Sequence, residues 1–475
     1  MIATHLPRLT LLAALALTAL TAAPAQAAPV WPADLPKFGA DKPLQVPAIT
    51  QLTLANGLQV WVLPRQGLPR VDFVLAMRGA GFGADAADAP GLAKLLAGLL
   101  NEGTPQRSSR QIAEAAQSMG GSVGANASND GITVSANALA SHAPRMAALL
   151  AEVTRQASFP DAEVTLAKTN ALQGLKVASA QPAFRAGKSL NEAIYGDHAY
   201  GRTQETEASL QAVSAAGLRA EHAKRFRPDR ALLIVTGRIT AAEAQKLAKA
   251  HFGDWKATGD PVAEPAATPA SRPVQRLLLE RPGSVQATVR LGQPGAAASG
   301  ADQVALRLTS TILGTGFSSR VNLNLREEKG YTYGARAGGV SYRAGGAITG
   351  GADVRNEVTG AAITEFLKEY RRIGSERVSE TEMTSNKRFV AGSYLLSTQL
   401  QGAVAQQLAN NWLVGLPAEF LGQFVPAIQK VTPEQVLATA QRYFNPETQS
   451  LVVVGDPDKI GEQLKALGDF RSVKP

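Results

Sequence analysis

The sequence contains no cysteine. This absence excludes disulfide bonds, thiolate metal sites and cysteine nucleophiles. Aromatic residues make up only 5% of the chain, and the 48 basic residues are scattered rather than clustered. Because a nucleic-acid surface needs a clustered basic face with stacking aromatics, that class of partner is excluded. The dispersed net charge of +9 predicts solubility and mild attraction to anionic surfaces or acidic peptides.

Long apolar runs are lacking after Leu20. Arg8, the apolar run from Leu9 to Leu20 and the small residues up to Ala27 are typical of a secretory signal peptide, residues 1–27. A membrane-spanning helix needs about 20 apolar residues, and no later stretch approaches that length. We therefore expect a periplasmic or secreted protein without an integral membrane segment after cleavage. Retention of the segment as an uncleaved anchor is the alternative.

Proline marks two segments without regular structure. Residues 28–48 contain five prolines and predict an extended lead-in. Residues 258–274 lose all periodicity and again fill with proline, which is typical of a linker. The expected domains are therefore residues 49–257 and residues 275–475.

Strand and helix patterns mix along the first of these domains. Alternating apolar residues on either side of Asn56-Gly57 predict a β-hairpin from Leu52 to Val62. Helical patterns follow at 90–101, 109–119 and 143–157, with a strand pattern around Ile132. Because the order is not a strict alternation of strand and helix, the prediction is an α+β fold.

The two expected domains repeat one pattern. Phe226-Arg227-Pro228 and the apolar run to Gly237 match Phe444-Asn445-Pro446 and the run to Gly455, residue for residue and without a gap. Helical patterns follow both copies, at 241–251 and 460–467. The repeat predicts a duplicated α+β unit.

A helical segment in the first half carries a family motif from which the reactive residues are missing. Residues 91–104, from Gly91-Leu92-Ala93 to Gly103-Thr104, resemble the pitrilysin (insulinase-like, mitochondrial-processing-peptidase-like) zinc peptidase helix. In that family Gly-Leu-Ala leads into His-x-x-Glu-His. Two histidines four residues apart share a helical face and bind zinc, while the glutamate activates the metal-bound water.

The resemblance places non-ligands at every position of this zinc site. Lys94 and Gly98 stand where the two histidines would be, and Ala97 replaces the glutamate base. The third ligand comes from a later helix in the family, and the matching residue here is Gly174. The four histidines beyond the signal segment are not paired at helical ligand spacing. We therefore expect no metal in this chain.

The second half keeps a motif of the same family. Leu325-Arg326-Glu327, Gly330 and Tyr333 are similar to its arginine-tyrosine signature. Gly330 suits a helix end, so Arg326 on the last helical turn and Tyr333 at a strand start can converge. The resemblance implies that the arginine holds a substrate carbonyl and that the tyrosine hydroxyl stabilises the oxyanion. The plain alternative is a surface arginine and a packed tyrosine.

Glycines 120, 121 and 124 precede a strand pattern in the first half. The stretch around Gly124 and Ala125 resembles the edge strand with which the family holds an extended peptide by main-chain hydrogen bonds. A simple turn is the alternative.

These residues predict the non-zinc subunit of a periplasmic heterodimeric metallopeptidase. The resemblance implies duplicated ferredoxin-like domains and a homologous partner that carries the zinc and cleaves peptides or unfolded polypeptides, with Arg326 and Tyr333 completing its site. The alternative is a catalytically inactive structural or peptide-binding scaffold, like the zinc-less relatives among the core subunits of the respiratory chain. A homodimer with metal-independent activity is the weakest option, because no serine, histidine and aspartate arrangement is recognisable.

Overall fold

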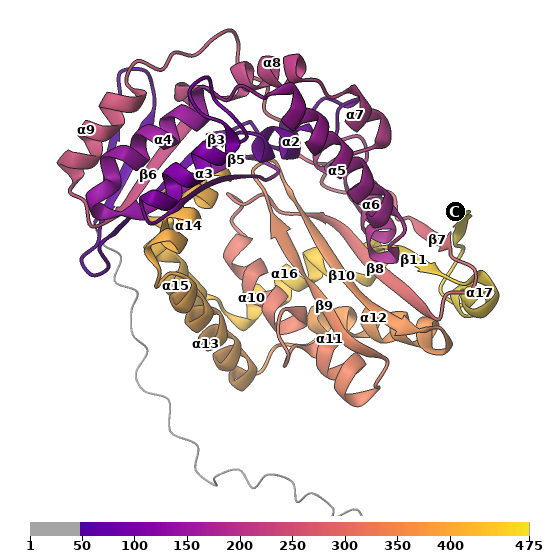
Figure 1. Cartoon of the computed structure of the whole chain (residues 1–475). Coiled ribbons are helices and arrows are strands. Elements are labelled where there is room, and N and C mark those ends of the chain that lie inside the picture. Colours follow the sequence, from indigo (N-terminus) through magenta and orange to yellow (C-terminus); the bar gives the residue numbers. More distant parts are fainter. Residues whose placement is uncertain (1–47, 475) are drawn as a thin grey trace, which may run out of the picture. The chain divides into compact units, whose positions relative to one another are not determined.

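The computed structural model describes residues 48–474 (Figure 1). The expected signal peptide and all of the lead-in except Ala48 lie outside these residues. Within residues 48–474, no helix combines the length and the apolar character needed to cross a membrane.

Two six-stranded sheets organise the described chain. The first has the order β1-β2-β6-β3-β5-β4, and only its β2–β6 pair is parallel. The predicted hairpin is confirmed as β1 and β2, joined by a turn in which Gly57 has a φ of +90°. The strands of this sheet are β1 (Thr50–Thr53), β2 (Gln59–Pro64), β3 (Arg70–Arg78), β4 (Ser122–Ala127), β5 (Gly131–Leu139) and β6 (Ala231–Gly237).

The second sheet repeats this plan with the order β12-β7-β11-β8-β10-β9, apart from its outermost strand β12. Its third strand, β11, pairs in parallel with β7 and antiparallel with β8, as β6 does with β2 and β3. The predicted duplication of an α+β unit is therefore confirmed. The strands are β7 (Arg276–Glu280), β8 (Gln286–Gly295), β9 (Thr332–Ser341), β10 (Gly346–Arg355), β11 (Ser450–Gly455) and β12 (Arg471–Val473).

Several helices begin at a capping residue whose side chain satisfies one of the first backbone N–H groups. Ser108, Thr240 and Thr432 each form a capping box at the start of a helix. In the first half the helices are α2 (Leu92–Gly98), α3 (Ser109–Ser118), α4 (Ala143–Arg155), α5 (Asp161–Ser179), α6 (Pro182–Tyr195), α7 (Glu207–Ala212), α8 (Ala215–Arg225) and α9 (Ala241–Phe252). In the second half they are α10 (Gln303–Gly314), α11 (Arg320–Asn322), the π-helix η5 (Leu323–Glu328), α12 (Thr359–Ser375), α13 (Glu380–Ser397), α14 (Gln401–Leu413), α15 (Phe420–Lys430), α16 (Pro433–Tyr443) and α17 (Pro457–Lys465). Short 3₁₀ turns lie at Phe82–Ala84, Ala140–His142, Ala199–Gly201, Pro228–Arg230, Asn356–Val358 and Pro446–Thr448.

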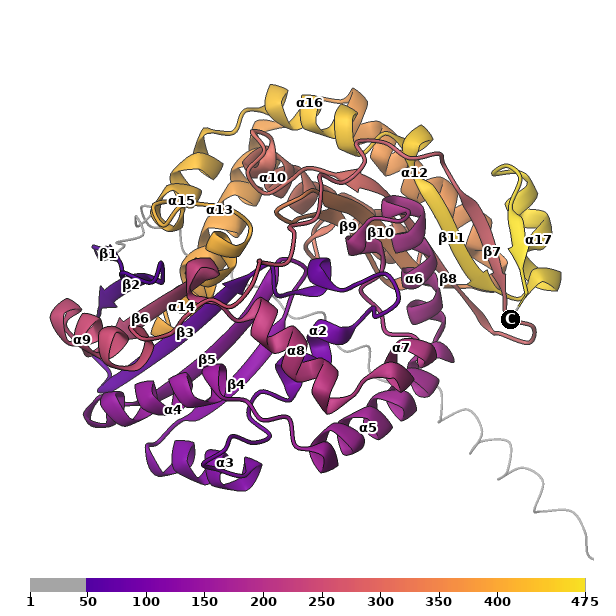
Figure 2. The same cartoon turned by 90° about the horizontal axis from the view of Figure 1, so that it is seen from above.

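Helices lie on both faces of each sheet, and one helix of each half packs on the sheet of the other. The inner faces pack against helices of their own half in two large apolar cores. Leu408 and Trp412 of α14 bury against the outer face of the first sheet, and Leu190 and Ile194 of α6 bury against that of the second. Figure 2 shows both helices beside the strands that they cover. We call this arrangement the helix exchange.

The segment between α9 and β7, residues 253–275, contains no helix or strand but is held by hydrogen bonds. Arg227 and Arg230 donate to the carbonyls of Gly259 and Val262, at 3.0 and 2.9 Å. Further on, the backbone N–H of Thr268 donates to the carbonyl of Ala344 at 2.8 Å. The segment is therefore fixed to both halves along its length.

Candidate functional site

Arg326 and Tyr333 lie together at the start of the edge strand β9. The π-helix η5 is followed by Gly330, whose φ of +62° reverses the chain so that Tyr331 N–H donates to Leu325 O at 2.8 Å. β9 begins at once, at Thr332. As a result the Arg326 guanidinium carbon is 5.1 Å from the centre of the Tyr333 ring. The convergence that the sequence predicts across this turn is present in the structure.

A β-bulge presents Tyr333 to solvent. β9 and β10 pair Ala335 with Ala352 and Thr332 with Val354, so two residues of β9 oppose the single residue Asp353. The Thr332 hydroxyl stabilises the bulge, since it donates to Asp353 O at 2.8 Å and accepts from Gly334 N–H at 3.2 Å. Bulges of this kind re-aim side chains beside functional sites. The Tyr333 side chain is 91% exposed.

Phe317, to which sequence reasoning assigns no role, lies on the other side of Arg326. The guanidinium carbon of Arg326 is 4.0 Å from the centre of the Phe317 ring, so the cation lies between two aromatic rings. Buried Asn322 holds the loop in place: its amide donates to Phe317 O at 2.7 Å and its carbonyl accepts from Ala335 N–H at 3.3 Å. The sequence feature that could have pointed to Phe317 is its bulky aromatic side chain between Gly316 and Ser318.

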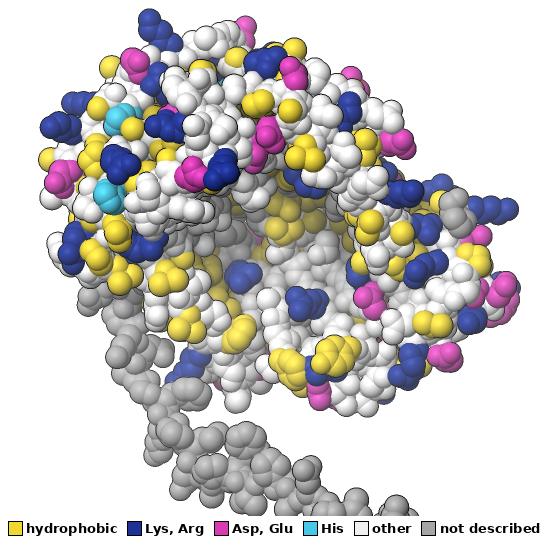
Figure 3. Space-filling model, viewed as in Figure 1, with side chains coloured by type: hydrophobic (Ala, Val, Ile, Leu, Met, Phe, Trp, Pro, Cys, Tyr) yellow, Lys and Arg dark blue, Asp and Glu magenta, His cyan; other side chains and the backbone are white. Residues whose placement is uncertain are grey.

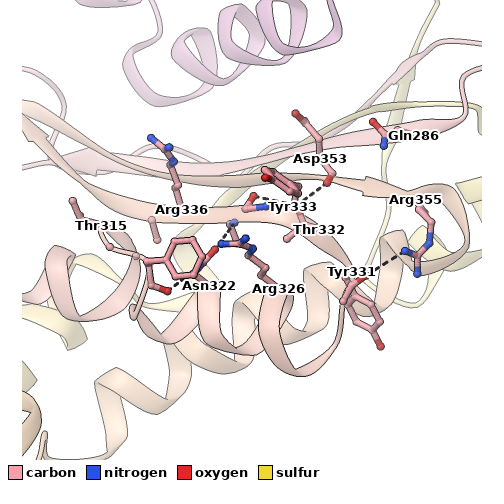
Figure 4. Close-up of a pocket in the computed structure, with 17 residues that line it drawn as sticks. Gln286, Thr315, Asn322, Arg326, Tyr331, Thr332, Tyr333, Arg336, Asp353 and Arg355 are labelled. Carbon is pink, nitrogen blue, oxygen red and sulfur yellow. Dashed lines mark hydrogen bonds between the residues drawn. The ribbon is translucent and has the colours of Figure 1, made fainter. Parts of the chain in front are cut away.

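These side chains line a pocket of about 1190 Å³ at the β9 edge (Figure 4). Its charged groups are mostly basic, because Arg336 and Arg355 join Arg326, and its Asp353 pairs with Arg290 at 3.3 Å. The Arg326 guanidinium has an ion pair with Glu327 at 3.4 Å. A phenol O–H and a guanidinium are both hydrogen-bond donors, so the pair can bind a carbonyl oxygen or an oxyanion.

The former metal positions of the first half lie on α2 and α5 but carry no donor atoms for zinc. The Lys94 side chain is 64% exposed, and its ammonium pairs with Glu205 at 2.7 Å. Ala97 is buried in the core, and a Cβ at Gly98 or Gly174 would meet no atom within 4 Å. An ammonium, a methyl group and two glycines do not fit a zinc ion. Nor does any other cluster of three or more histidine or acidic residues suited to a metal occur within residues 48–474.

A buried ion pair holds α2 in place at its N-terminus. The Asp85 carboxylate accepts from Ala93 N–H at 3.1 Å and pairs with Arg225 at 2.8 Å, with both side chains at most 2% exposed. Burial raises the pKa of Asp85, although Arg225 opposes the shift. The helix therefore keeps its position through polar contacts that involve none of the former metal positions.

The strand expected to hold peptides is β4, at the edge of the first sheet. Gly124 is exposed, whereas the Ala125 side chain packs toward the core. A groove of about 720 Å³ runs along this edge. Its lining includes the neutral polar side chains of Asn126, Ser135, Asn137, Gln406 and Asn410. An edge strand is confirmed here, while peptide binding by Gly124 and Ala125 stays a prediction.

Comparison with known proteins gives the same family from both halves. Residues 79–207 match the family model for Insulinase (Peptidase family M16), and residues 212–389 match the one for the Peptidase M16 inactive domain. An uncharacterized zinc protease of Mycobacterium bovis is 24% identical over 439 residues, which cover 91% of this chain and 100% of the relative. A Helicobacter pylori protein named Non-peptidase homolog YmxG is 22% identical over 401 residues, 83% of this chain and 91% of its own.

Solved structures agree. The crystal structure of a peptidase M16 inactive domain from Pseudomonas fluorescens superposes with a TM-score of 0.80 at 26% identity, covering 86% of this chain and 98% of that one. A protease from Helicobacter pylori gives 0.81 at 18% identity, with 86% and 100% covered, and this second likeness shows the fold alone. The chain therefore belongs to the M16 family of pitrilysin or insulinase-like peptidases, and it lacks the residues with which the family motif binds zinc.

Proposed function

We propose that this chain is the non-zinc subunit of a periplasmic heterodimeric metallopeptidase. The observation that carries the proposal is the contrast between two sites. All three ligand positions and the base position of the former zinc site lack the family's functional groups, yet Arg326 and Tyr333 meet on a bulged edge strand beside an open pocket. A chain with oxyanion donors and no metal site needs a homologous partner that supplies the zinc.

In this proposal the chain's own residues bind and orient the substrate. The Arg326 guanidinium, in contact with the rings of Phe317 and Tyr333, donates to a carbonyl oxygen of the peptide. The Tyr333 hydroxyl donates to the oxygen that becomes negative as water attacks the peptide bond. The partner's zinc supplies the activated water.

The test is reconstitution with the zinc peptidases of the same compartment. We expect one of them to gain peptidase activity when the purified chain is added. Arg326→Ala or Tyr333→Phe should each lower the rate of that complex by about 10²- to 10³-fold while its zinc content stays unchanged. Arg110→Ala is the matched control, because it removes an exposed arginine on α3. If no zinc peptidase of the compartment changes rate, the proposal is wrong.

A scaffold without catalytic role is the second candidate, and the name of the Helicobacter pylori relative, a non-peptidase homolog, favours it. A scaffold would retain its full function after Tyr333→Phe. The periplasmic location rests on the signal-like residues 1–27, and a fusion of these residues to a reporter enzyme would test export directly.

A further inference from the structure

The outer face of the second sheet is only partly covered. Helix α6 packs on strands β8 and β11, and Ile194 of the helix shares an apolar cluster with Val452 of β11 and Leu277 of the neighbouring β7. Beyond α6, strands β9 and β10 border a shallow groove of about 460 Å³. Glycines form much of its lining, so the strand backbones lie open to a ligand: Gly334, Gly338, Gly339, Gly350 and Gly351.

A row of basic side chains crosses this groove. Gly351 of β10 pairs with Arg336 of β9 on one side and with Arg290 of β8 on the other. Ala335 and Ala337 of β9 are buried in the helix-covered core, so Arg336 points to the opposite face, as Figure 4 also shows. Gly351 leaves room for the Arg290 side chain, since a Cβ there would lie 2.7 Å from Arg290 Cδ.

The charges in the groove do not cancel. Arg290 donates to Asp353, to Ala352 O and to Val289 O, so the single carboxylate of the groove already has a partner. Arg336 is exposed and forms no ion pair with any residue of the described range. Around the bulge on the other face of β9 lies Arg326, whose charge is partly offset by Glu327. In Figure 3 this face is hollowed over the second sheet, where more basic than acidic side chains stand.

We infer that the β9 edge binds an extended acidic peptide, with its carboxylate side chains directed to Arg336. β9 is the last strand of its sheet and has no neighbour on its outer side among the described strands. A peptide added there places alternate side chains on the two faces, one toward Arg336 and the other toward Arg326. This inference rests on the proposed function, because the bound peptide would be the substrate of the heterodimer. It adds that this substrate is an acidic peptide.

The experiment measures binding to the full chain alone, without a partner. Calorimetric titrations use extended peptides that differ only at alternate positions, which carry glutamate, glutamine or lysine. We expect the glutamate peptide to bind about three- to tenfold more tightly than the glutamine peptide at low salt, and the lysine peptide to bind weakest. The preference should fall as ionic strength rises.

Arg336→Gln should abolish the preference for glutamate, and Arg336→Lys should keep part of it. The control Arg110→Gln removes the same charge from a distant exposed helix and should leave the preference intact. Equal affinities of the wild-type chain for glutamate and glutamine peptides would overturn the inference, as would an equal loss in the Arg110 variant. Because the titration contains no zinc subunit, its result does not depend on finding an activating partner. Selective binding together with a failed reconstitution would overturn the proposed function and leave this inference standing.

Discussion

The two halves of the chain share one framework and differ in their chemistry. Apart from the outermost strands β1 and β12, their sheets have the same strand order. When the spacing between the two copies of the sequence repeat is applied to the third-ligand position, Gly174 on α5 aligns with another glycine, Gly392 on α13. The first half has lost every donor for zinc, whereas the second keeps an arginine and a tyrosine in contact. The fold has therefore tolerated the loss of a metal site without losing its architecture.

The reason is that different contacts hold the two sites in place. Helix α2 is anchored by the buried Asp85–Arg225 pair and by an apolar core that contains Ala97. Breaking such a pair costs about 3–5 kcal/mol, whereas changes at exposed Lys94 or at the open Gly98 affect only the surface. In the first half, the residues of the former zinc site are therefore distinct from the contacts that hold the fold together. In the second half they are joined, because Asn322 connects the loop of Phe317 to strand β9.

The largest expected effect comes from restoring the ligands. The triple variant Lys94→His, Gly98→His, Gly174→Glu places three donors at positions that are exposed or have open space. We expect about one zinc ion per chain by elemental analysis after dialysis, and no peptide cleavage, because Ala97 still replaces the base. Asparagine and glutamine at the same three positions form the control. A folded triple variant that stays free of zinc would contradict the assignment of these three positions to one former zinc site.

Acid should destabilise the fold through His222, a buried titrating group that only the first copy of the repeat carries at this place. His222 on α8 is buried against Thr154 O at 2.8 Å, and burial lowers its pKa from 6.5 to about 4. The repeat puts buried Ala440 at the matching place of the second half. Because the folded pKa is depressed, this stability is fully present above pH 6.5 and is lost as pH falls through about 4, by about 3 kcal/mol.

Urea unfolding between pH 7.5 and 4.5 tests whether the free energy of unfolding falls with acidification. His222→Gln removes the titrating group, so the free energy of unfolding of that variant should fall less steeply with acidification than that of the wild type. His142, which is only partly buried in the same half, serves as control through His142→Gln. Equal slopes for wild type and His222→Gln would contradict the assignment.

The smallest effect concerns Phe317. Its ring covers one face of the Arg326 guanidinium, and such contacts contribute about 0.5–2 kcal/mol. Phe317→Ala should therefore reduce kcat of the reconstituted complex by about two- to thirtyfold, mainly through a misplaced Arg326, and Phe317→Tyr should restore it. Phe389→Ala removes another exposed aromatic nearby, on α13, and should leave kcat unchanged. Equal losses of kcat in Phe317→Ala and Phe389→Ala would show that Phe317 has no specific effect on Arg326.

The sequence predicts those features of the site and the fold that depend on neighbours along the chain. The meeting of Arg326 and Tyr333 follows from a helix end, one glycine in the left-handed region and the start of a strand. The hairpin around Gly57 follows from similar local rules.

Features that depend on distant neighbours escape such reasoning. The bulge at Tyr333 arises from pairing with β10, and the sandwich around Arg326 requires the loop of Phe317 to fold back through Asn322. The helix exchange joins segments from opposite halves of the chain, and no periodicity in α6 or α14 indicates which sheet they cover. The π-helix η5 is also a rare form that the sequence pattern alone would not lead one to expect.

The helix exchange makes the two copies of the repeat mutually dependent. If either half were produced alone, one sheet would lose its outer cover and present Trp61, Val74 and Ile234, or their counterparts around Val452, to water. Neither copy can therefore be removed without leaving the other prone to aggregation. The half without catalytic residues thus has a structural role, because its helix α6 shields the apolar surface of the other half.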